Sequence, residues 1–456
     1  MRGRLIGVAL AFLAATLLST VASGAEPERR LRAGAARVTL RVPDGTPLAG
    51  YGSMRRRPLV PDILGRHPYA FWFKPGEGAL DELSVRALVI YEGGIRVTWI
   101  AADLIAVDQG FKRRLEERLT GSGIRPGTVV VSASHTHSGP GAFLEPALFA
   151  AAAMDRESEG VRNVILNAMV EATRRAGAAA RDARIAVARG DAPAMTTSRI
   201  GASLDPEIVV LRVTTTQHEP IAVVWNYAIH GTMLGPRNLR LSGDVTGVAS
   251  RALESDLRVP ALFVNGAVGD VSPHHHGEAE MDATGRALAK AVRAGWDAAE
   301  PAERTPLATR TTRVRLPSPA FSMRHCVAGW IPGWARLPLG SFLPNETELT
   351  AVALGPVAFV TMPGEPVTAL GREVKAASRP RFPHAFVAGV SNDYLGYFVR
   401  AEDYERKAYV TCAAVYGPKV GACLTATAID LLRRLPDDAA GAGGAITACD
   451  LTTMAR

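Results

Sequence analysis

VVVSASHTHSGPGAF, residues 129–143, joins an apolar run rich in β-branched side chains to two histidines and a glycine-proline turn. The run predicts a buried strand, and the Ser-Gly-Pro-Gly segment predicts the turn that ends it. Residues i and i+2 of an extended chain face the same side, so His135 and His137 are expected to face one cavity. Such a pair suits a metal ion or proton transfer. A surface pair is the alternative, because two histidines are too few ligands for zinc.

The same arrangement recurs further along the chain. Apolar runs precede the polar or glycine-rich segments IHGT, GDVSP, PGE and SNDYLGY, and several of these segments lead into a predicted helix. In α/β proteins, ligands bind beyond the carboxyl ends of strands. We therefore predict an α/β fold, a single catalytic domain built on a mixed sheet, with the site at the carboxyl ends of its strands.

Periodicity places the other elements. Strands are predicted over residues 36–41, 83–101, 185–189 and 207–214. Helices are predicted over residues 111–119, 159–184, 246–257 and 278–300 and within 404–435. Asp244 is expected to cap the helix over 246–257. Residues 48–78 form a long Gly/Pro/Arg-rich loop, a length typical of lids and binding segments.

Composition describes an ordinary globular chain. The 456 residues are 47% hydrophobic and 21% charged, enough for a large core, which excludes a disordered protein. The pI near 9.5 reflects an excess of arginine. It indicates either attraction to anionic lipid or polymer, or a compositional bias of the genome. No basic run is interleaved with aromatic residues, so nucleic acid is not an expected partner.

The first 25 residues are typical of a secretory signal. Arg2 and Arg4 precede an apolar run over residues 5–18, and the small residues of VASGA follow. A membrane anchor is the alternative, although the run is shorter than the ~20 residues that a span needs. We expect a secreted protein, periplasmic or extracellular, with a catalytic domain over residues 26–435 and a loosely ordered tail over 436–456.

All four cysteines fall in the carboxyl-terminal third, and an exported chain can oxidise them. Two disulfides are expected among Cys326, Cys412, Cys423 and Cys449. On one continuous helix Cys412 and Cys423 would be ~16 Å apart and could not bond. Gly417-Pro418 can break that helix, so the connectivity stays open.

Three of the strand ends supply the ligand types of a catalytic zinc site. His135, His230 and Glu365 offer imidazole and carboxylate, which leaves one position for water. Taken singly, His230 could be a core histidine, and Glu365 could be favoured by a helix N-terminus. These alternatives weaken when all three residues occupy the same place relative to a strand.

At these motifs the chain resembles the neutral, non-lysosomal ceramidases. The resemblance rests on SASHTHSGPGAF, NYAIHGT followed by LSGDVTG, NGAVGDVSP, MPGEPVTALG and SNDYLGYFVRAEDYERKAYVTCAAVYGP, in the family's order. It implies a secreted or membrane-surface zinc amidase that cuts the N-acyl bond of ceramide into a fatty acid and sphingosine. The longer family members carry a further immunoglobulin-like domain, and this sequence ends after the catalytic region.

Position by position, the resemblance implies one zinc ion per chain held by His135, His230, Glu365 and Tyr397. It corrects the spacing argument, because only the first histidine of the pair would bind metal. The other implied site residues are His137, which would contact the reacting group, Ser272 as the essential serine, Tyr409, and Arg199 as the family's arginine.

The implied chemistry is attack of a zinc-bound hydroxide on the amide carbonyl. His137, Arg199 and Tyr409 are candidate donors to the oxyanion, and a histidine or tyrosine can protonate the departing amine. Ser272 is expected to orient substrate or relay a proton, with an acyl-transfer nucleophile as the alternative.

Two segments differ from the family's pattern. The loop at Arg199 is short, and GDVSP is followed by His274-His275-His276, either an accessory metal site or a solvated loop. The Trp- and Leu-rich stretch that begins at Val327 and ends at Leu343 is expected to form a wall of the lipid site, to touch a bilayer, or to cover the core.

Two other functions stay open. One is a zinc hydrolase for a different N-acyl or ester substrate. The other is a non-catalytic lipid-binding envelope protein on the same scaffold.

Overall fold

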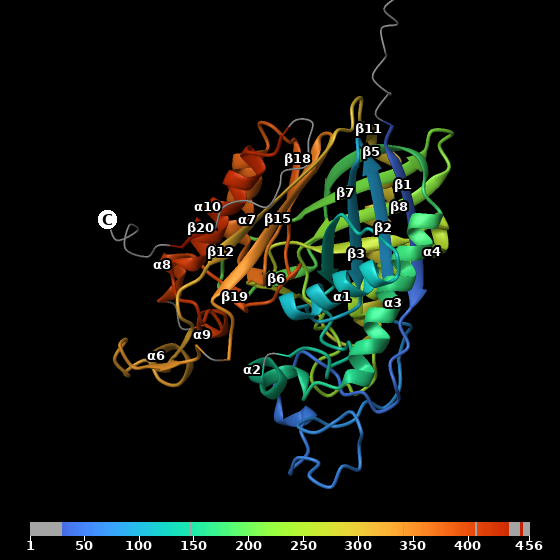
Figure 1. The fold of residues 1–456 in the computed structure, drawn as a ribbon. Coiled ribbons are helices and arrows are strands. Elements are labelled where there is room, and N and C mark those ends of the chain that lie inside the picture. The colour runs from blue at the N-terminus through green and yellow to red at the C-terminus, as the bar shows by residue number, and fades with distance from the viewer. Residues whose placement is uncertain (1–29, 146, 341, 406–407, 437–446, 450–456) are drawn as a thin grey trace, which may run out of the picture.

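The chain folds into four layers, with two β-sheets face to face and helices on both outer sides (Figure 1). This computed structural model describes residues 30–145, 147–340, 342–405, 408–436 and 447–449. The predicted signal segment over residues 1–25 lies outside the described residues. Among those that are described, no helix combines the length and apolarity needed to cross a bilayer.

The larger sheet is mixed, as predicted. Its strands β3 and β4 are parallel, as are β8 and β9, and the other neighbours are antiparallel. In spatial order the strands are β4 (Thr128–Ala133), β3 (Ile95–Ala102), β2 (Ser84–Glu92), β1 (Arg32–Thr39), β5 (Arg181–Asp191), β7 (Glu207–Thr215), β8 (Pro220–Tyr227) and β9 (Ala261–Asn265), with β11 (Glu300–Pro301) beside β5.

The edges of this sheet come together. The strand pairings make β4 and β8 run in opposite directions. On a flat sheet their carboxyl ends would therefore lie at opposite edges of the strands, far from each other. Each step between strands adds roughly 20–25° of twist, and the steps from β4 to β9 accumulate. As a result β4 also contacts β9. Asn265, at the end of β9, donates to the carbonyls of Ser134 (3.4 Å) and Ile229 (3.1 Å), which follow β4 and β8.

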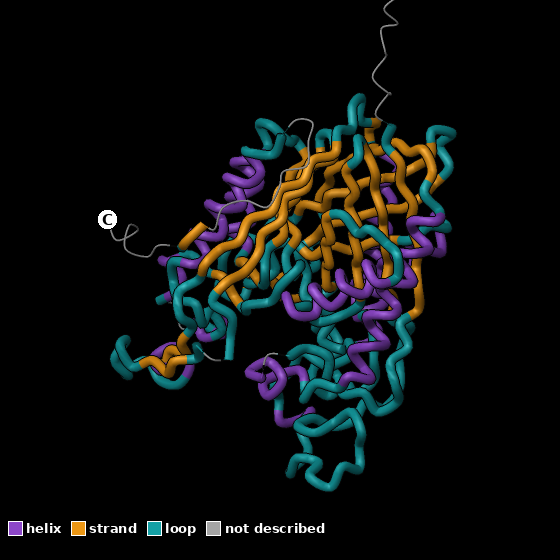
Figure 2. Tube along the Cα trace, viewed as in Figure 1, coloured by secondary structure: helices purple, strands orange, loops and turns teal. Residues whose placement is uncertain are grey.

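The second sheet covers the inner face of the first (Figure 2). Its strands are, in spatial order, β18 (His384–Ala388), β16 (Val357–Thr361), β15 (Glu346–Leu354), β12 (Leu307–Arg315) and β20 (Thr447–Ala448). Trp99 of β3 stacks on Phe359 of β16 with ring centroids 4.2 Å apart. This apolar layer buries the inward-facing side chains of both sheets.

Helices cover the outer faces. On the first sheet these are α1 (Gln109–Gly121), α3 (Glu159–Ala178), α4 (Asp244–Leu257) and α5 (Glu278–Ala298), and on the second α7 (Thr368–Ser378) and α10 (Val420–Arg433). In β2, Val89 packs toward α1 and α3 while Leu88 and Ile90 face the second sheet. Because both faces are buried, the strands read as apolar runs.

Short elements complete the chain around the lower end of the two sheets in Figure 1. They are η1 (Met54–Arg56), α2 (Ala147–Phe149), η2 (Ala150–Met154), β6 (Thr196–Ser198), β10 (Val271–Pro273), β13 (Ala320–Ser322), α6 (Met323–Cys326), β14 (Arg336–Pro338), β17 (Glu365–Pro366), β19 (Tyr397–Phe398), α8 (Ala401–Tyr404) and α9 (Tyr409–Cys412).

The cysteines form two disulfides, Cys326–Cys412 and Cys423–Cys449. Cys412 ends α9 and Cys423 lies in α10, so the two are not on one helix. In the predicted tail, β20 pairs with β12 and Cys449 is buried, whereas most of its other residues lie outside the described ones.

The predicted cap of α4 is wrong. Gly243 is the N-cap residue, and Asp244 is the first residue of the helix, with φ +52°. The Asp244 carboxylate accepts from the backbone amide of Val245, the next residue of α4, at 2.7 Å, and from those of Met233 and Leu234, both at 3.3 Å. It therefore ties the start of α4 to the loop that follows β8.

A buried arginine joins the first sheet to α4. Arg86 Nε lies 2.5 Å from Glu254 Oε1, and Arg86 Nη1 lies 3.3 Å from Asp103 Oδ2. We expect Arg86→Ala to lower the free energy of unfolding by about 3–5 kcal/mol, because a buried carboxylate loses its counter-charge. Denaturant unfolding of both proteins measures this. Arg286→Ala, at an exposed position of α5, is the control, and an equal loss in both would contradict the expectation.

Candidate metal centre and active site

The two histidines of the opening motif lie just beyond a strand end. Strand β4 ends at Ala133, and His135 takes a left-handed backbone conformation with φ +63°. The extended chain expected through both histidines is therefore wrong at this point. Their rings still approach to 4.9 Å between centroids. Between them, Thr136 forms a parallel bridge with Gly231 in the loop after β8.

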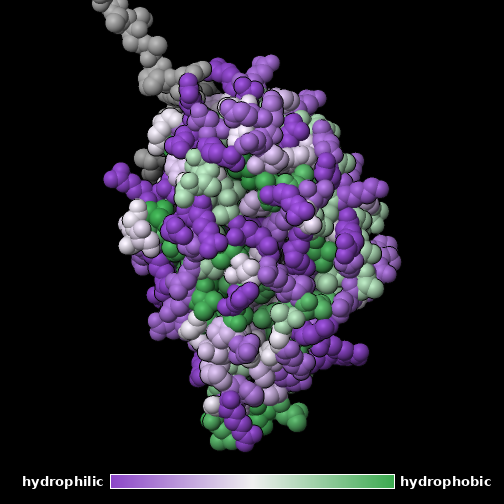
Figure 3. Space-filling model, turned by 90° about the vertical axis from the view of Figure 1, so that its right-hand side faces the viewer, coloured by the Kyte–Doolittle hydropathy of each residue, from purple (hydrophilic) through white to green (hydrophobic). Residues whose placement is uncertain are grey.

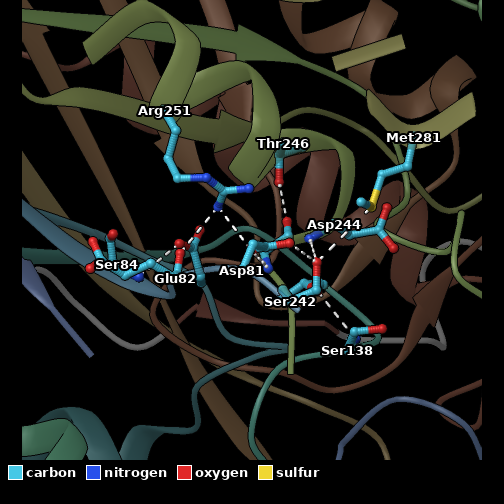
Figure 4. A network of polar contacts seen from close by, with 12 residues as sticks. Asp81, Glu82, Ser84, Ser138, Ser242, Asp244, Thr246, Arg251 and Met281 are labelled. Atoms are coloured by element: carbon cyan, nitrogen blue, oxygen red, sulfur yellow. Dashed lines mark hydrogen bonds and ion pairs between the residues drawn. The ribbon is translucent and has the colours of Figure 1, made fainter. Parts of the chain in front are cut away.

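A network of hydrogen bonds and an ion pair holds this loop in place (Figure 4). The Thr136 hydroxyl donates to the Ser242 carbonyl, and the Ser242 amide donates to the Ser138 carbonyl, both at 2.8 Å. The Ser242 hydroxyl donates to Asp81, which also pairs with Arg251 of α4 at 2.9 Å. These contacts anchor the loop that carries His135 and His137 on the side that faces α4, away from the second sheet.

A third imidazole arrives from the loop after β8. The His137 amide donates to the Gly231 carbonyl at 2.7 Å, which sets His230 beside the first two histidines. One nitrogen from each of His135, His137 and His230 lies within 4.8 Å of the others. Three strand-end imidazoles therefore form a group that could bind a metal ion.

Glu365 completes the group from β17, which follows β16 of the second sheet in the chain. Strand β17 pairs in parallel with β19, with Glu365 opposite Tyr397. The Glu365 carboxylate lies 3.2 Å from His135 Nε2 and 3.0 Å from His230 Nε2. The Tyr394 hydroxyl donates to Glu365 Oε1 at 2.6 Å, which fixes the orientation of the carboxylate.

The remaining predicted site residues lie beside Glu365. Strands β6 and β10 pair with Ser272 opposite Thr197, which brings Arg199 next to the serine. Arg199 Nε donates to Ser272 Oγ at 2.7 Å, and Arg199 Nη1 donates to the Tyr397 hydroxyl at 3.1 Å. The Tyr409 ring lies 5.6 Å from that of Tyr397, between centroids. The structure therefore brings all eight predicted residues into one region.

Burial sets the charge states of the centre. Loss of water, followed by repulsion from Arg199, lowers the pKa of His230 to about 3. Burial and the neighbouring histidines also hold the pKa of His137 well below its usual value. Burial alone would raise the pKa of Glu365, but attraction from His135 and His230 holds it well below its ordinary range. Neutral imidazole and ionised carboxylate are the forms that bind metals.

The hydrogen-bonding state of the three histidines and Glu365 also fits the binding of a divalent ion. His135 Nδ1 donates to the Ile105 carbonyl at 2.7 Å, which leaves Nε2 with its lone pair toward Glu365. Within the described part of the chain, several buried atoms of the group have no hydrogen-bond partner: His135 Nε2, both ring nitrogens of His137 and His230, and Glu365 Oε2. A cation with nitrogen and oxygen ligands would satisfy them.

A cavity of about 310 Å³ opens onto this group. His135, His137, Glu365 and Tyr397 line one part of it. The rest of the wall is largely apolar and includes Leu144, Phe149, Met154, Phe321, Leu339 and Leu343. The polar centre thus faces a space suited to a hydrocarbon group.

Two tyrosines of the site were not assigned roles from the sequence. Tyr394 binds Glu365, and the Tyr51 ring lies 4.8 Å from that of His137, between centroids. Tyr394 stands in the SNDYLGY segment and Tyr51 in the loop over residues 48–78, but spacing alone does not say which tyrosine of a segment turns inward. The triplet from His274 to His276 is exposed and lies outside the metal group found among the described residues.

Part of the chain matches a known protein family. Residues 65–291 match the family described as "Neutral/alkaline non-lysosomal ceramidase, N-terminal". That range holds His135, His137, Arg199, His230 and Ser272. Neutral ceramidase B of Dictyostelium discoideum is 25% identical over an alignment of 238 residues that covers 46% of this chain and 33% of that protein. Neutral ceramidase of Pseudomonas aeruginosa is 26% identical over an alignment of 213 residues that covers 41% of this chain and 31% of that protein.

The matched regions span about a third or less of these relatives' own lengths. In fold, the crystal structure of neutral ceramidase from Pseudomonas aeruginosa superposes with a TM-score of 0.76 at 19% identity, covering 92% of this chain and 77% of that one. A structure described as "Ceramidase complexed with C2" gives the same TM-score. Residues 65–291 of this chain are therefore a neutral/alkaline non-lysosomal ceramidase N-terminal domain, and the chain is distantly related to the neutral ceramidases and similar to them in fold.

Proposed function

We propose that this chain is a secreted, zinc-dependent amidohydrolase that cleaves the N-acyl bond of ceramide or a related N-acyl lipid, giving a fatty acid and an amine. One observation carries the proposal. A buried group of three imidazoles and a carboxylate opens into an apolar cavity of about 310 Å³. A centre suited to hydrolysis thus faces a space suited to a lipid chain.

His135, His230, Glu365 and Tyr397 are the residues proposed to hold one zinc ion. A bound zinc ion would supply Lewis acidity that polarises the acyl carbonyl and activates water. His137 lies in the same group but is assigned to contact the reacting amide. The orientation of His135 by the Ile105 carbonyl supports its role as a ligand.

The remaining residues act on the substrate. Burial would lower the pKa of Arg199, but Tyr397 and Glu365 raise it above its ordinary value, so the guanidinium stays charged. It can stabilise negative charge that develops on the acyl oxygen while it orients Ser272. His137 and Tyr409 are assigned to donate to the same oxygen or to protonate the departing amine. Ser272 is assigned to orient the substrate.

Two further features support an extracellular lipid enzyme. The Cys326–Cys412 and Cys423–Cys449 disulfides are consistent with an oxidising compartment. The segment over residues 327–343 presents Trp330 and Trp334 to solvent, which suits peripheral contact with a membrane.

The test compares substrates on purified protein of known zinc content. We expect hydrolysis of N-acyl-sphingosine to exceed that of short N-acyl amino acids and of an ester analogue, because the cavity wall is largely apolar. A preference for either competitor would favour the other zinc hydrolase and overturn the lipid amidase. Binding of lipid without zinc or turnover would favour the non-catalytic lipid-binding protein.

A further inference from the structure

Exposed large apolar side chains are concentrated at one end of the molecule. Among the described residues they are Met54, Leu59, Val60, Ile63, Leu64, Trp72, Val327, Trp330, Trp334, Leu337, Phe342 and Tyr409. Nearly all belong to two segments, here called the first rim (residues 50–75) and the second rim (residues 320–340). Both rims project from the lower end of the fold in Figure 1, and Figure 3 shows apolar residues at the lower tip.

The bases of both rims form walls of the active-site cavity. Gly50 of the first rim and Phe321 and Leu339 of the second line that cavity. Arg57 donates to the carbonyl of Ala152, which also lines it, at 3.0 Å. The apolar tips therefore stand around the same cavity that holds the catalytic centre.

The first rim is anchored despite its exposed tips. The Asp155 carboxylate accepts from the backbone amides of Phe71, Trp72 and Phe73 at 2.9–3.0 Å. The buried Arg56 donates to the Ala49 carbonyl at 2.7 Å. Leu59 nevertheless has a relative exposure of 102%, so this fixed loop presents its side chain fully to solvent.

The second rim is anchored in the same way. Its strands β13 and β14 pair with each other, and the Ala320 amide donates to the Val415 carbonyl at 2.9 Å. The Cys326–Cys412 disulfide ties the turn between the strands to α9. Trp330 and Trp334 remain 85% and 83% exposed at its tip.

The charge of the rims favours an anionic surface. Arg55, Arg66, Arg324 and Arg336 are exposed, and Asp62 is the acidic residue of the first rim. The sequence of the second rim contains no aspartate or glutamate. Exposed tryptophan and leucine flanked by arginine is the composition of surfaces that insert shallowly into anionic bilayers. A second copy of the chain would instead bring like charge against like in a symmetric contact.

We propose that the two rims form a docking surface for an anionic lipid bilayer. Docking would seat the mouth of the cavity, with Tyr409 at its edge, against the headgroups, so that an acyl chain can enter without crossing water. This inference extends the proposed function by naming its partner surface. Its test therefore measures binding separately from hydrolysis.

The test is co-sedimentation of the purified exported chain with vesicles of phosphatidylcholine alone or with added phosphatidylglycerol. We expect at least about tenfold tighter binding to the anionic vesicles. The variants Trp330→Ala with Trp334→Ala, and separately Leu59→Ser with Ile63→Ser, should each weaken that binding by about tenfold or more. Arg66→Glu with Arg336→Glu should remove the preference for anionic lipid. Arg286→Glu with Arg433→Glu, exposed but outside the rims, should bind like the wild type.

Thermal unfolding and turnover of a water-soluble, short-chain N-acyl substrate are measured on each protein. A wild type that hydrolyses this substrate but binds neither vesicle overturns the docking surface alone. A wild type that binds vesicles but hydrolyses no N-acyl compound overturns the proposed function alone. Concentration-dependent dimers without vesicle binding, dispersed by the tryptophan changes, would replace the bilayer by a contact between copies.

Discussion

Replacing Glu365 by alanine is expected to remove the bound metal and to lower hydrolysis by at least about a thousandfold. The Glu365 carboxylate lies 3.2 Å from His135 Nε2 and 3.0 Å from His230 Nε2. Its loss takes away a ligand and leaves the Tyr394 hydroxyl without its acceptor in a buried site. Elemental analysis of the purified proteins, together with turnover of an N-acyl-sphingosine, measures both effects.

Two companion variants make this experiment more specific. Glu365→Gln keeps the shape of the side chain and an oxygen that can accept from Tyr394. Any loss of metal or turnover that Glu365→Gln shares with Glu365→Ala is therefore due to the missing negative charge. His137→Ala separates two ligand sets. Retained zinc with lost turnover supports contact between His137 and the reacting group, whereas lost zinc makes His137 a ligand. Full zinc content and normal turnover in Glu365→Ala would refute the proposed centre.

Replacing Arg199 by alanine is expected to lower kcat by about a hundredfold to a thousandfold while the zinc content stays unchanged. The guanidinium holds Ser272 Oγ through Nε at 2.7 Å and the Tyr397 hydroxyl through Nη1 at 3.1 Å. Arg199→Lys should recover little activity, because one ammonium group does not reproduce this two-pronged geometry. Steady-state kinetics of the three proteins at equal zinc content measures the effect.

Ser272→Ala provides the matched comparison. If Arg199 acts partly by orienting Ser272, the double variant should lose much less than the product of the two single losses. Arg286→Ala, on the exposed face of α5, should retain wild-type kcat. An Arg199→Ala enzyme within about threefold of wild type would remove Arg199 from the proposed mechanism.

Much of the candidate site was predictable because its signals are local. A strand that is buried on both faces must be apolar along its length. The residue after it can be polar, because the pairing with neighbouring strands ends there. This transition identified His135, His230 and Glu365 from the ends of three runs, and the structure brings both histidines within 3.2 Å of the Glu365 carboxylate. The strand-end segment SNDYLGY also holds Tyr397, but its role as a ligand came from resemblance to the family, as did the assignments of Arg199 and Tyr409.

Tertiary structure alone decided how these segments meet. Neither the coiling of a largely antiparallel sheet that joins the ends of β4 and β8, nor the pairing of Glu365 with Tyr397, is encoded within a single segment. The left-handed turn at His135 and the choice of Cys326–Cys412 over other pairings depend likewise on distant partners. Local sequence sets which side chains a segment can offer, whereas their convergence depends on twist and register summed over many strands.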